Sequence, residues 1–193
     1  MSTIVILLRT ASLLAFAGPM LLVDVSRRSP RARTRARQAG GHRAPLVANF
    51  AAFGLFFPSL VIFSGGSEAS MEVLLALSGC LLAVAGTALV LRSRAELGPA
   101  WSFVPKAGQG TGLVTTGPYR LVRHPIYLGL ALLAMGEALA FDSWPAFAIV
   151  LFGIVPTFAW RALAEDKLLH RTFGESYEAY RQRTRAYCRL RMK

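Results

Sequence analysis

The sequence predicts an all-α protein that crosses a membrane several times. Hydrophobic residues make up 54% of the 193 residues, which is high for a soluble domain, yet the formal net charge is +12. The charged residues are concentrated outside long apolar runs, and this segregation is typical of polytopic membrane proteins. A soluble nucleic-acid-binding domain would instead interleave aromatic and basic residues, and the arginine-rich stretch Ser26–Pro45 contains no aromatic residue.

Five apolar segments of about 17–23 residues can each cross a hydrocarbon core of about 30 Å as a helix. The first contains Arg9 and is followed by arginines rather than by a cleavage site, so we expect it to be retained and not to act as a signal peptide. The five predicted spans are Thr3–Val25, Leu46–Phe63, Met71–Leu91, Pro125–Phe141 and Trp144–Leu163.

The distribution of cations predicts the orientation of these spans. The short connections Ser64–Ser70 and Asp142–Ser143 contain no lysine or arginine. Apart from Arg9, every lysine and arginine lies in one of three segments: the linker Ser26–Pro45, the loop Arg92–His124 and the tail from Arg161 onward. Because cytoplasmic loops are enriched in these residues, we expect the N-terminus outside and these three segments in the cytoplasm.

Small residues recur along the third span. Gly79, Ala83, Gly86 and Thr87 are three to four residues apart or adjacent, so they form a stripe on one helix face. In membrane helices such a stripe permits close approach of a neighbouring helix. We therefore predict a packing role for it.

The most polar motif, Gly-Pro-Tyr-Arg-Leu-Val-Arg-His-Pro-Ile-Tyr, occupies Gly117 to Tyr127 between two apolar segments. Pro125 suits the first helical position, where its missing N–H is harmless, and it disfavours the α conformation at His124. We expect His124 to cap the helix, with its ring beside the N–H groups of the first turn. Together with Arg123, that helix terminus would attract an anion.

A second polar cluster closes the last apolar run. Arg161 and Glu165 are one helical turn apart, and Asp166 follows. An interfacial ion pair is the simplest interpretation, but Arg161 still belongs to the apolar run, where a charge is costly and usually functional. Because the turn at Asp142–Ser143 is tight, the last two spans should be antiparallel, and both polar clusters should meet at one level.

Five ordered motifs lie between Arg92 and Arg185. They are Leu97-Gly98-x-x-Trp101-Ser102, Gly110-x-x-Leu113-Val114-x-x-Gly117-Pro118-Tyr119, Arg123-His124-Pro125-x-Tyr127, Glu165-Asp166-x-x-Leu169 and Phe173-Gly174-x-x-Tyr177-x-x-Tyr180. This set resembles the isoprenylcysteine carboxyl methyltransferase family, and the related phospholipid methyltransferases share parts of the pattern.

The resemblance implies an integral membrane methyltransferase that uses S-adenosylmethionine without a Rossmann domain. It places Arg161 at the reacting group, and we predict Arg161 and Glu165 as the catalytic residues. The predicted cofactor contacts, to which Arg123 is added from its place at the helix terminus, are Leu113, Val114, Tyr119, Arg123, His124, Tyr127, Glu165 and Asp166. Two positions depart from the family pattern: Asp166 stands where a second glutamate is common, and Thr111 replaces a larger polar residue.

We therefore divide the chain into a membrane scaffold and a catalytic region. Residues 1–91 hold the first three spans and the cytoplasmic linker 26–45. Residues 92–193 hold the cytoplasmic cofactor-binding loop 92–124, the last two spans and a cytoplasmic tail that continues as a helix. No metal is expected to take part, because His42, His124 and His170 are too scattered in the sequence to form a metal site.

The expected methyl acceptor is the carboxylate of a prenylated cysteine or a similar lipophilic acid, which can arrive through the membrane lipid. A phospholipid amine or a small thiol is the alternative acceptor. A transporter or scaffold without catalysis is a third interpretation, but a transporter is expected to place polar residues at mid-bilayer. Glu137 is the candidate for such a residue in the fourth span, and we interpret it as a packing or snorkelling residue near the far face.

Overall fold

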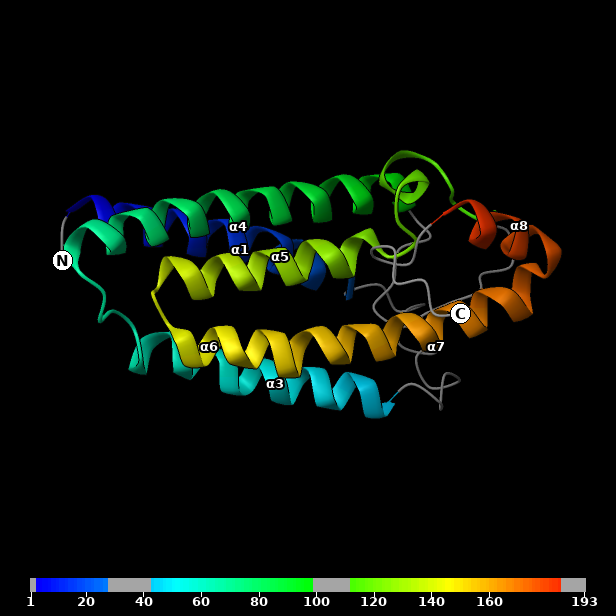
Figure 1. Cartoon of the computed structure of the whole chain (residues 1–193). Coiled ribbons are helices and arrows are strands. Elements are labelled where there is room, and N and C mark those ends of the chain that lie inside the picture. Colours follow the sequence, from blue (N-terminus) through cyan, green and yellow to red (C-terminus); the bar gives the residue numbers. More distant parts are fainter. Residues whose placement is uncertain (1–2, 28–42, 99–111, 185–193) are drawn as a thin grey trace.

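The computed structural model describes residues 3–27, 43–98 and 112–184 of the chain (Figure 1). Within these ranges the protein consists of helices and turns and contains no β-strand, as the sequence predicts. The elements in chain order are α1 (Thr3–Arg27), α3 (Arg43–Ile62), α4 (Ala69–Leu97), the 3-10 turn η2 (Gly117–Arg120), α5 (Pro125–Ala140), α6 (Trp144–Ile149), the π-helical turn η3 (Val150–Ile154), α7 (Val155–Phe173) and α8 (Glu175–Arg183).

The long helices run side by side along one axis, and α8 lies across one end of the bundle (Figure 1). The elements α6, η3 and α7 follow one another without a break, so the segment from Trp144 to Phe173 is a single long helix with a π-helical turn inside it. Helix α3 packs along this long helix, while α4 packs against both α1 and α5. Helix α5 contacts α6, η3 and α7 and runs in the opposite direction (Figure 1). The last two predicted spans are therefore antiparallel neighbours, as expected.

The protein is an integral membrane protein, because three of its described helices are long and apolar enough to cross a bilayer. These are Ala44–Ile62, Ala69–Leu97 and Trp144–Phe173. Thr3–Ala15 and Pro125–Ala140 are apolar but shorter. Helix α5 begins at Pro125 and ends one residue before its predicted boundary, whereas α4 and α7 extend beyond theirs. The count of five spans and the orientation remain predictions.

Helices α4 and α5 touch through their backbones. A Cβ atom on Gly136 would lie 2.5 Å from the backbone nitrogen of Ala83, and one on Gly86 would lie 2.5 Å from the carbonyl oxygen of Gly129. Glycine is therefore required for this close approach, which confirms the predicted packing role of the small-residue stripe. Thr87 faces another neighbour, because its hydroxyl donates a 2.9 Å hydrogen bond to the Ala15 carbonyl of α1.

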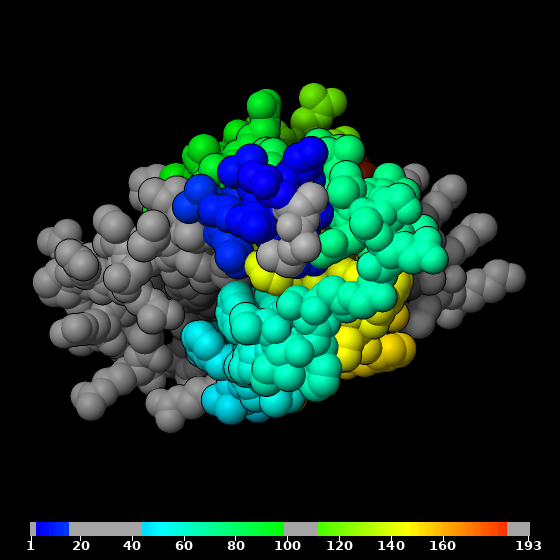
Figure 2. Space-filling view, turned by 90° about the vertical axis from the view of Figure 1, so that its left-hand side faces the viewer, coloured from blue at the N-terminus to red at the C-terminus, as the bar shows by residue number. Residues whose placement is uncertain are grey.

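The two short, cation-free connections meet at the end of the bundle opposite α8. The Gly65 N–H donates to the Phe141 carbonyl at 3.1 Å, and the Ser67 N–H donates to Asp142 Oδ2 at 2.9 Å. Figure 2 looks onto this end, where the start of α1, the α3–α4 connection and the start of α6 lie together. The sequence-based topology requires this arrangement, since both connections were predicted on one side of the membrane.

Polar side chains also join α1 to its neighbours inside the bundle. Arg9 pairs with Glu72 of α4 at 3.1 Å and donates through Nε to the Ala140 carbonyl at 2.8 Å. Ser12 Oγ donates to Glu137 Oε2 of α5 at 3.0 Å, and Glu137 is completely buried. Glu137 therefore packs inside the bundle, and the alternative that it snorkels toward the surface is wrong.

Candidate functional site

His124 lies where the chain enters α5. Pro125 occupies the first helical position, as predicted, and His124 is the N-cap residue with φ −123° and ψ 60°. Its ring, however, makes no capping hydrogen bond to the first turn. Instead, Nε2 lies 2.7 Å from Asp166 Oδ1, and Nδ1 lies 3.5 Å from Glu165 Oε2. The expected location of the ring beside the helix N–H groups is thus corrected, because two carboxylates of α7 are the stronger hydrogen-bond partners.

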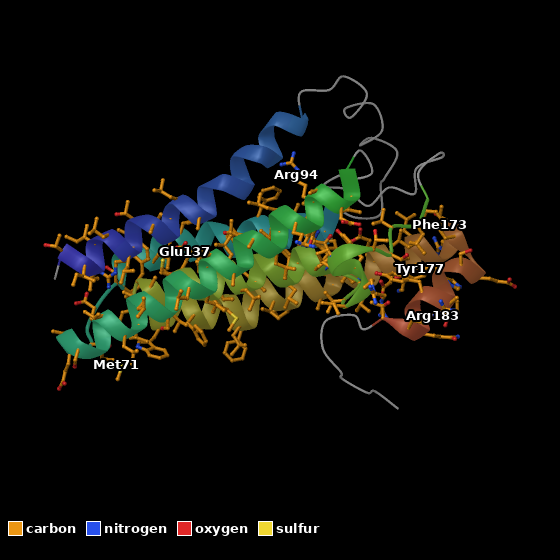
Figure 3. All side chains as sticks on the ribbon, turned by 90° about the horizontal axis from the view of Figure 1, so that it is seen from above. Met71, Arg94, Glu137, Phe173, Tyr177 and Arg183 are labelled. Atoms are coloured by element: carbon orange, nitrogen blue, oxygen red, sulfur yellow. The ribbon has the colours of Figure 1, made fainter. Side chains whose placement is uncertain are left out.

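These contacts confirm that the two polar clusters meet at one level. The turn between α5 and α6 reverses the chain, and the continuous helix through α7 then returns Glu165 and Asp166 to the start of α5. We name His124, Glu165 and Asp166 the acid–histidine cluster. Figure 3 shows Tyr177, which contacts Asp166 of this cluster, far along the helix axes from Glu137.

The cluster favours a protonated His124. Burial by itself would lower the pKa of His124, but hydrogen bonds to Asp166 and Glu165 and the negative charges of both acids outweigh it and raise the pKa to about 9. The imidazolium can then donate through both ring nitrogens at neutral pH. A buried cation held between two acids, one of them partly exposed, is the electrostatic core of the site.

Arg123 was predicted to form an anion subsite with the helix terminus, but it points into the protein. Its Nη2 lies 3.3 Å from Asp166 Oδ2, and its Nη1 donates to the carbonyls of Thr184 at 2.8 Å and Arg181 at 3.3 Å. The guanidinium therefore ties the end of α8 to the acid–histidine cluster. The contact of Arg123 with a cofactor stays a prediction.

Aromatic rings extend the site from the cluster toward the apolar part of the bundle. Tyr127 stacks between His124, at 5.8 Å between ring centroids, and Phe158 of α7, at 5.5 Å. The guanidinium carbon of Arg161 lies 5.2 Å from the centroid of Tyr127. Both predicted residues, Tyr127 and Arg161, are thus adjacent to the acid–histidine cluster, on the side where α7 continues into the apolar bundle.

Tyr119 is buried in η2, and burial raises the pKa of its phenol well above the usual range. Leu113 and Val114 precede η2 and are half-buried. The structure therefore brings Tyr119, Arg123, His124, Tyr127, Arg161, Glu165 and Asp166 to the α8 end of the bundle. The motif residue Trp101 and the departure at Thr111 lie outside the described residues.

Helix α8 provides two residues to which sequence analysis gave no role. Gly174 adopts a φ of +51°, a conformation that glycine tolerates, and the chain turns there between α7 and α8. Tyr177 then donates a short hydrogen bond to Asp166 Oδ1, and Tyr180 donates to the Tyr119 carbonyl at 2.8 Å. Figure 3 shows Tyr177 at this end of the molecule. The sequence feature that could have indicated their role is the spacing of the two tyrosines in the motif at residues 173–180, because it places both rings on one helix face.

Within the described part of the chain, no three His, Cys, Asp or Glu side chains are grouped so as to hold a metal ion. The polar groups of the site are instead acids, a histidine, two arginines and tyrosines. Such a set can bind an organic cation at Glu165 and an anion at Arg161, side by side.

The family model described as phospholipid methyltransferase matches residues 74–176, more than half of the chain. The chain belongs to the phospholipid methyltransferase family. The matched segment contains α5, α7 and the whole acid–histidine cluster.

Similar proteins agree with this assignment. A protein-S-isoprenylcysteine O-methyltransferase of Schizosaccharomyces pombe is 36% identical over 100 residues, which cover 48% of this chain and 41% of the relative. The protein of the same name from Saccharomyces cerevisiae is 30% identical over 129 residues, which cover 66% of this chain and 53% of the relative. The chain thus spans about half the length of these curated relatives. The resemblance inferred from the motifs is confirmed at the level of the family.

A solved structure shows the same fold. The eukaryotic intramembrane Ras methyltransferase ICMT (isoprenylcysteine carboxyl methyltransferase) superposes with a TM-score of 0.58 at 20% sequence identity. The match covers 77% of this chain and 54% of that chain. The present chain therefore shares its helical arrangement with a membrane methyltransferase of known structure.

Proposed function

We propose that this protein is an S-adenosylmethionine-dependent methyltransferase of the membrane that methylates the carboxylate of an isoprenylcysteine-like lipophilic substrate. The observation that supports this most directly is the adjacency of two oppositely charged subsites. The acid–histidine cluster lies at the polar end of α5 and α7, and Arg161 lies one helical turn closer to the apolar bundle, on the Tyr127 ring. A polar cofactor and a lipophilic acid can thus approach from opposite directions.

The residues present fit the methionine part of S-adenosylmethionine, which carries an ammonium group. Glu165 is the more exposed of the two acids, with 29% of its side chain accessible, and can accept from such an ammonium. His124, Tyr119 and Tyr127 would line the cofactor site, and Leu113 and Val114 would cover its flat ring. Arg123 and Asp166 belong to the same predicted set. When bound, the cofactor would supply an activated methyl group on its sulfonium.

Arg161 would hold the acceptor. Its guanidinium is planar and can bind both oxygens of a carboxylate through paired N–H donors. Its cation–π contact with Tyr127 would restrain the side chain before the acceptor arrives, so less side-chain entropy would be lost on binding. Methyl transfer depends chiefly on alignment and exclusion of water. Glu165 and Arg161, on one face of α7, would align donor and acceptor.

The proposed topology has five spans, with the N-terminus outside and the active site at the cytoplasmic boundary. The cation-free connections lie at one end of the bundle, and Arg120, Arg123 and α8 lie at the other. This separation supports the orientation, because lysine and arginine are enriched on the cytoplasmic side. The polar cofactor would then reach the site from the cytosol.

A phospholipid amine or a small thiol is the second candidate acceptor. The match to the phospholipid methyltransferase family model favours a lipid acceptor of this kind. Such an acceptor would not require the paired donors of Arg161. The chemistry of the labelled product therefore distinguishes the two candidates.

The test uses purified protein in lipid nanodiscs with methyl-labelled S-adenosylmethionine, prenylcysteine analogues and a membrane lipid extract. The expected product is a labelled methyl ester, which alkali hydrolyses to volatile methanol. Label that resists alkali and stays with the lipid or thiol fraction would favour the second candidate. His124→Ala and Glu165→Ala should each weaken cofactor binding by about 1–3 kcal/mol. Unchanged binding in both variants, measured by calorimetry, would contradict the proposed cofactor site.

A further inference from the structure

The two neighbouring acids of α7 have different surroundings. Asp166 Oδ1 accepts hydrogen bonds from His124 Nε2 and from the Tyr177 hydroxyl, and Oδ2 accepts from Arg123 Nη2. A carboxylate offers about four lone-pair positions, so most of the capacity of Asp166 is already used within the protein. Its side chain is 17% exposed.

Glu165 is more accessible. It makes a longer contact, 3.5 Å from Oε2 to His124 Nδ1, and 29% of its side chain is exposed. Of the two acids, Glu165 therefore has more accessible surface for a ligand. The two carboxylates face the same imidazole from its two nitrogens.

Helix α8 also contacts Asp166, because the Tyr177 hydroxyl donates to the same Oδ1 that accepts from His124. Tyr177 is 1% exposed, so its hydroxyl is directed into the protein. The helix is anchored on either side of this contact, because Tyr180 donates to the Tyr119 carbonyl at 2.8 Å and Arg123 donates to the Thr184 carbonyl at 2.8 Å. The position of Asp166 is thus determined jointly by α5, α7 and α8.

We propose that Asp166 and Tyr177 are positioning residues that hold the His124 ring, and that Glu165 alone of the two acids contacts the ammonium of the cofactor. This assignment rests on the proposed function, and it replaces the expectation that both acids contact the cofactor. The aspartate at position 166 suits this role, because its carboxylate already accepts from three donors.

Among the described residues, the charged side chains in contact with His124 include Asp166 and Glu165 of α7. Asp166 in turn contacts Tyr177 of α8 and Arg123. Tyr127 stacks on the His124 ring from α5. Loss of the Asp166 charge removes the hydrogen-bonded anion that lies nearest to the ring. The titration of His124 is therefore a direct readout of the positioning role.

The first test compares Asp166→Asn with Glu165→Gln, which remove one charge each from adjacent positions. Each variant is titrated with S-adenosylhomocysteine and with its analogue that lacks the α-amino group. We expect the wild type to prefer the amino ligand by tenfold or more, Glu165→Gln to lose this preference, and Asp166→Asn to keep it. Loss of the preference in Asp166→Asn would overturn the assignment of Asp166 as a positioning residue.

The second test follows the imidazole signals by NMR of protein with 15N-labelled histidine. The chain has three histidines, so His124→Gln assigns the signal directly. We expect Asp166→Asn to lower the pKa of His124 by one unit or more. Tyr177→Phe should shift the His124 signals and lower turnover. Tyr180→Phe should leave the signals in place, because the Tyr180 hydroxyl donates to the Tyr119 carbonyl and Tyr177 supplies the hydroxyl that donates to Asp166.

The readouts separate this assignment from the proposed function. A protein that binds neither ligand would contradict the proposed cofactor site, yet the NMR titration would still decide whether Asp166 and Tyr177 hold the ring. An unchanged pKa of His124 in Asp166→Asn, or equal signals in Tyr177→Phe and wild type, would overturn the positioning role even in an active enzyme.

Discussion

His124 Nε2 lies 2.7 Å from Asp166 Oδ1, so the N-cap residue of α5 is hydrogen-bonded to a carboxylate on α7. The contact joins α5 and α7, which are antiparallel, at their polar ends. It also places a buried cation beside Glu165, the acid proposed to meet the cofactor. The stability and binding properties of the site should therefore depend on the protonation of this one ring.

Stability should fall as pH rises through about 9. The pKa of His124 is raised to about 9 in the folded protein, whereas an unperturbed histidine has a pKa near 6.5. The folded state therefore holds the proton more tightly than the unfolded state. The stabilisation is fully present below about pH 6.5 and is lost as pH rises through about 9.

The measurement for this pH dependence is the thermal unfolding midpoint in detergent across that range, for wild type and His124→Gln. The difference between the two curves should shrink toward high pH. A constant difference would show that protonated His124 contributes nothing to stability.

Arg161→Lys should lower turnover by roughly tenfold or more, which corresponds to about 1.4 kcal/mol of transition-state stabilisation. Lysine retains the positive charge but loses the planar pair of donors, and its contact with the Tyr127 ring would change. Cofactor affinity should change little, because the ammonium subsite at Glu165 is untouched. Steady-state kinetics with a prenylcysteine analogue provides the measurement. Full activity of the lysine variant would contradict a carboxylate acceptor.

Gly136→Ala should destabilise the protein by about 1–3 kcal/mol, because the added methyl group would collide with the backbone of α4. The new Cβ would lie 2.5 Å from the Ala83 nitrogen, and a backbone atom cannot rotate away. Gly54→Ala is the matched control, since nothing lies within 4 Å of a Cβ at that position. Thermal unfolding of the two variants in the same detergent tests this. Equal midpoints would mean that α4 and α5 do not touch through their backbones.

Ser12→Ala should destabilise the protein by about 1–3 kcal/mol, because it removes a hydrogen-bond donor from the buried Glu137. Ser78→Ala is the control: Ser78 is exposed and donates within its own helix to the Leu75 carbonyl. The free energy of unfolding should fall for the first variant and stay within about 0.5 kcal/mol of the wild-type value for the second. A similar small effect in both would show that the α1–α5 contact is energetically unimportant.

Reporter fusions test the proposed topology. Fusions after Val25, Leu91 and Lys193 should report the cytoplasm, whereas a fusion at Gly66 should report the exterior, because Gly66 lies in a cation-free connection. The connection at Asp142–Ser143 shares that end of the bundle, so a fusion there should agree with Gly66. A cytoplasmic signal from Gly66 would reverse the orientation and place the acid–histidine cluster on the other side of the membrane.

The sequence by itself determined the features that depend on local chemistry. The start of α5 at Pro125 follows from the fixed φ of proline. The close approach of α4 and α5 follows from the spacing of Gly79, Ala83 and Gly86. The meeting of His124 with Glu165 and Asp166 follows from a tight turn between two antiparallel helices. These inferences need only the fixed φ of proline, helical periodicity, a tight turn and the length of an apolar run.

Only the tertiary structure decided which partner each polar side chain takes. The sequence pointed the His124 ring and Arg123 toward a helix terminus, but in the fold the ring turns to Asp166 and the guanidinium also binds carbonyls at the end of α8. The turn at Gly174 directs α8 so that Tyr177 reaches Asp166. In a low-dielectric interior a buried polar group must be satisfied by whatever donor or acceptor packing places within reach. Because these partners lie on helices distant in sequence, no local pattern specifies them.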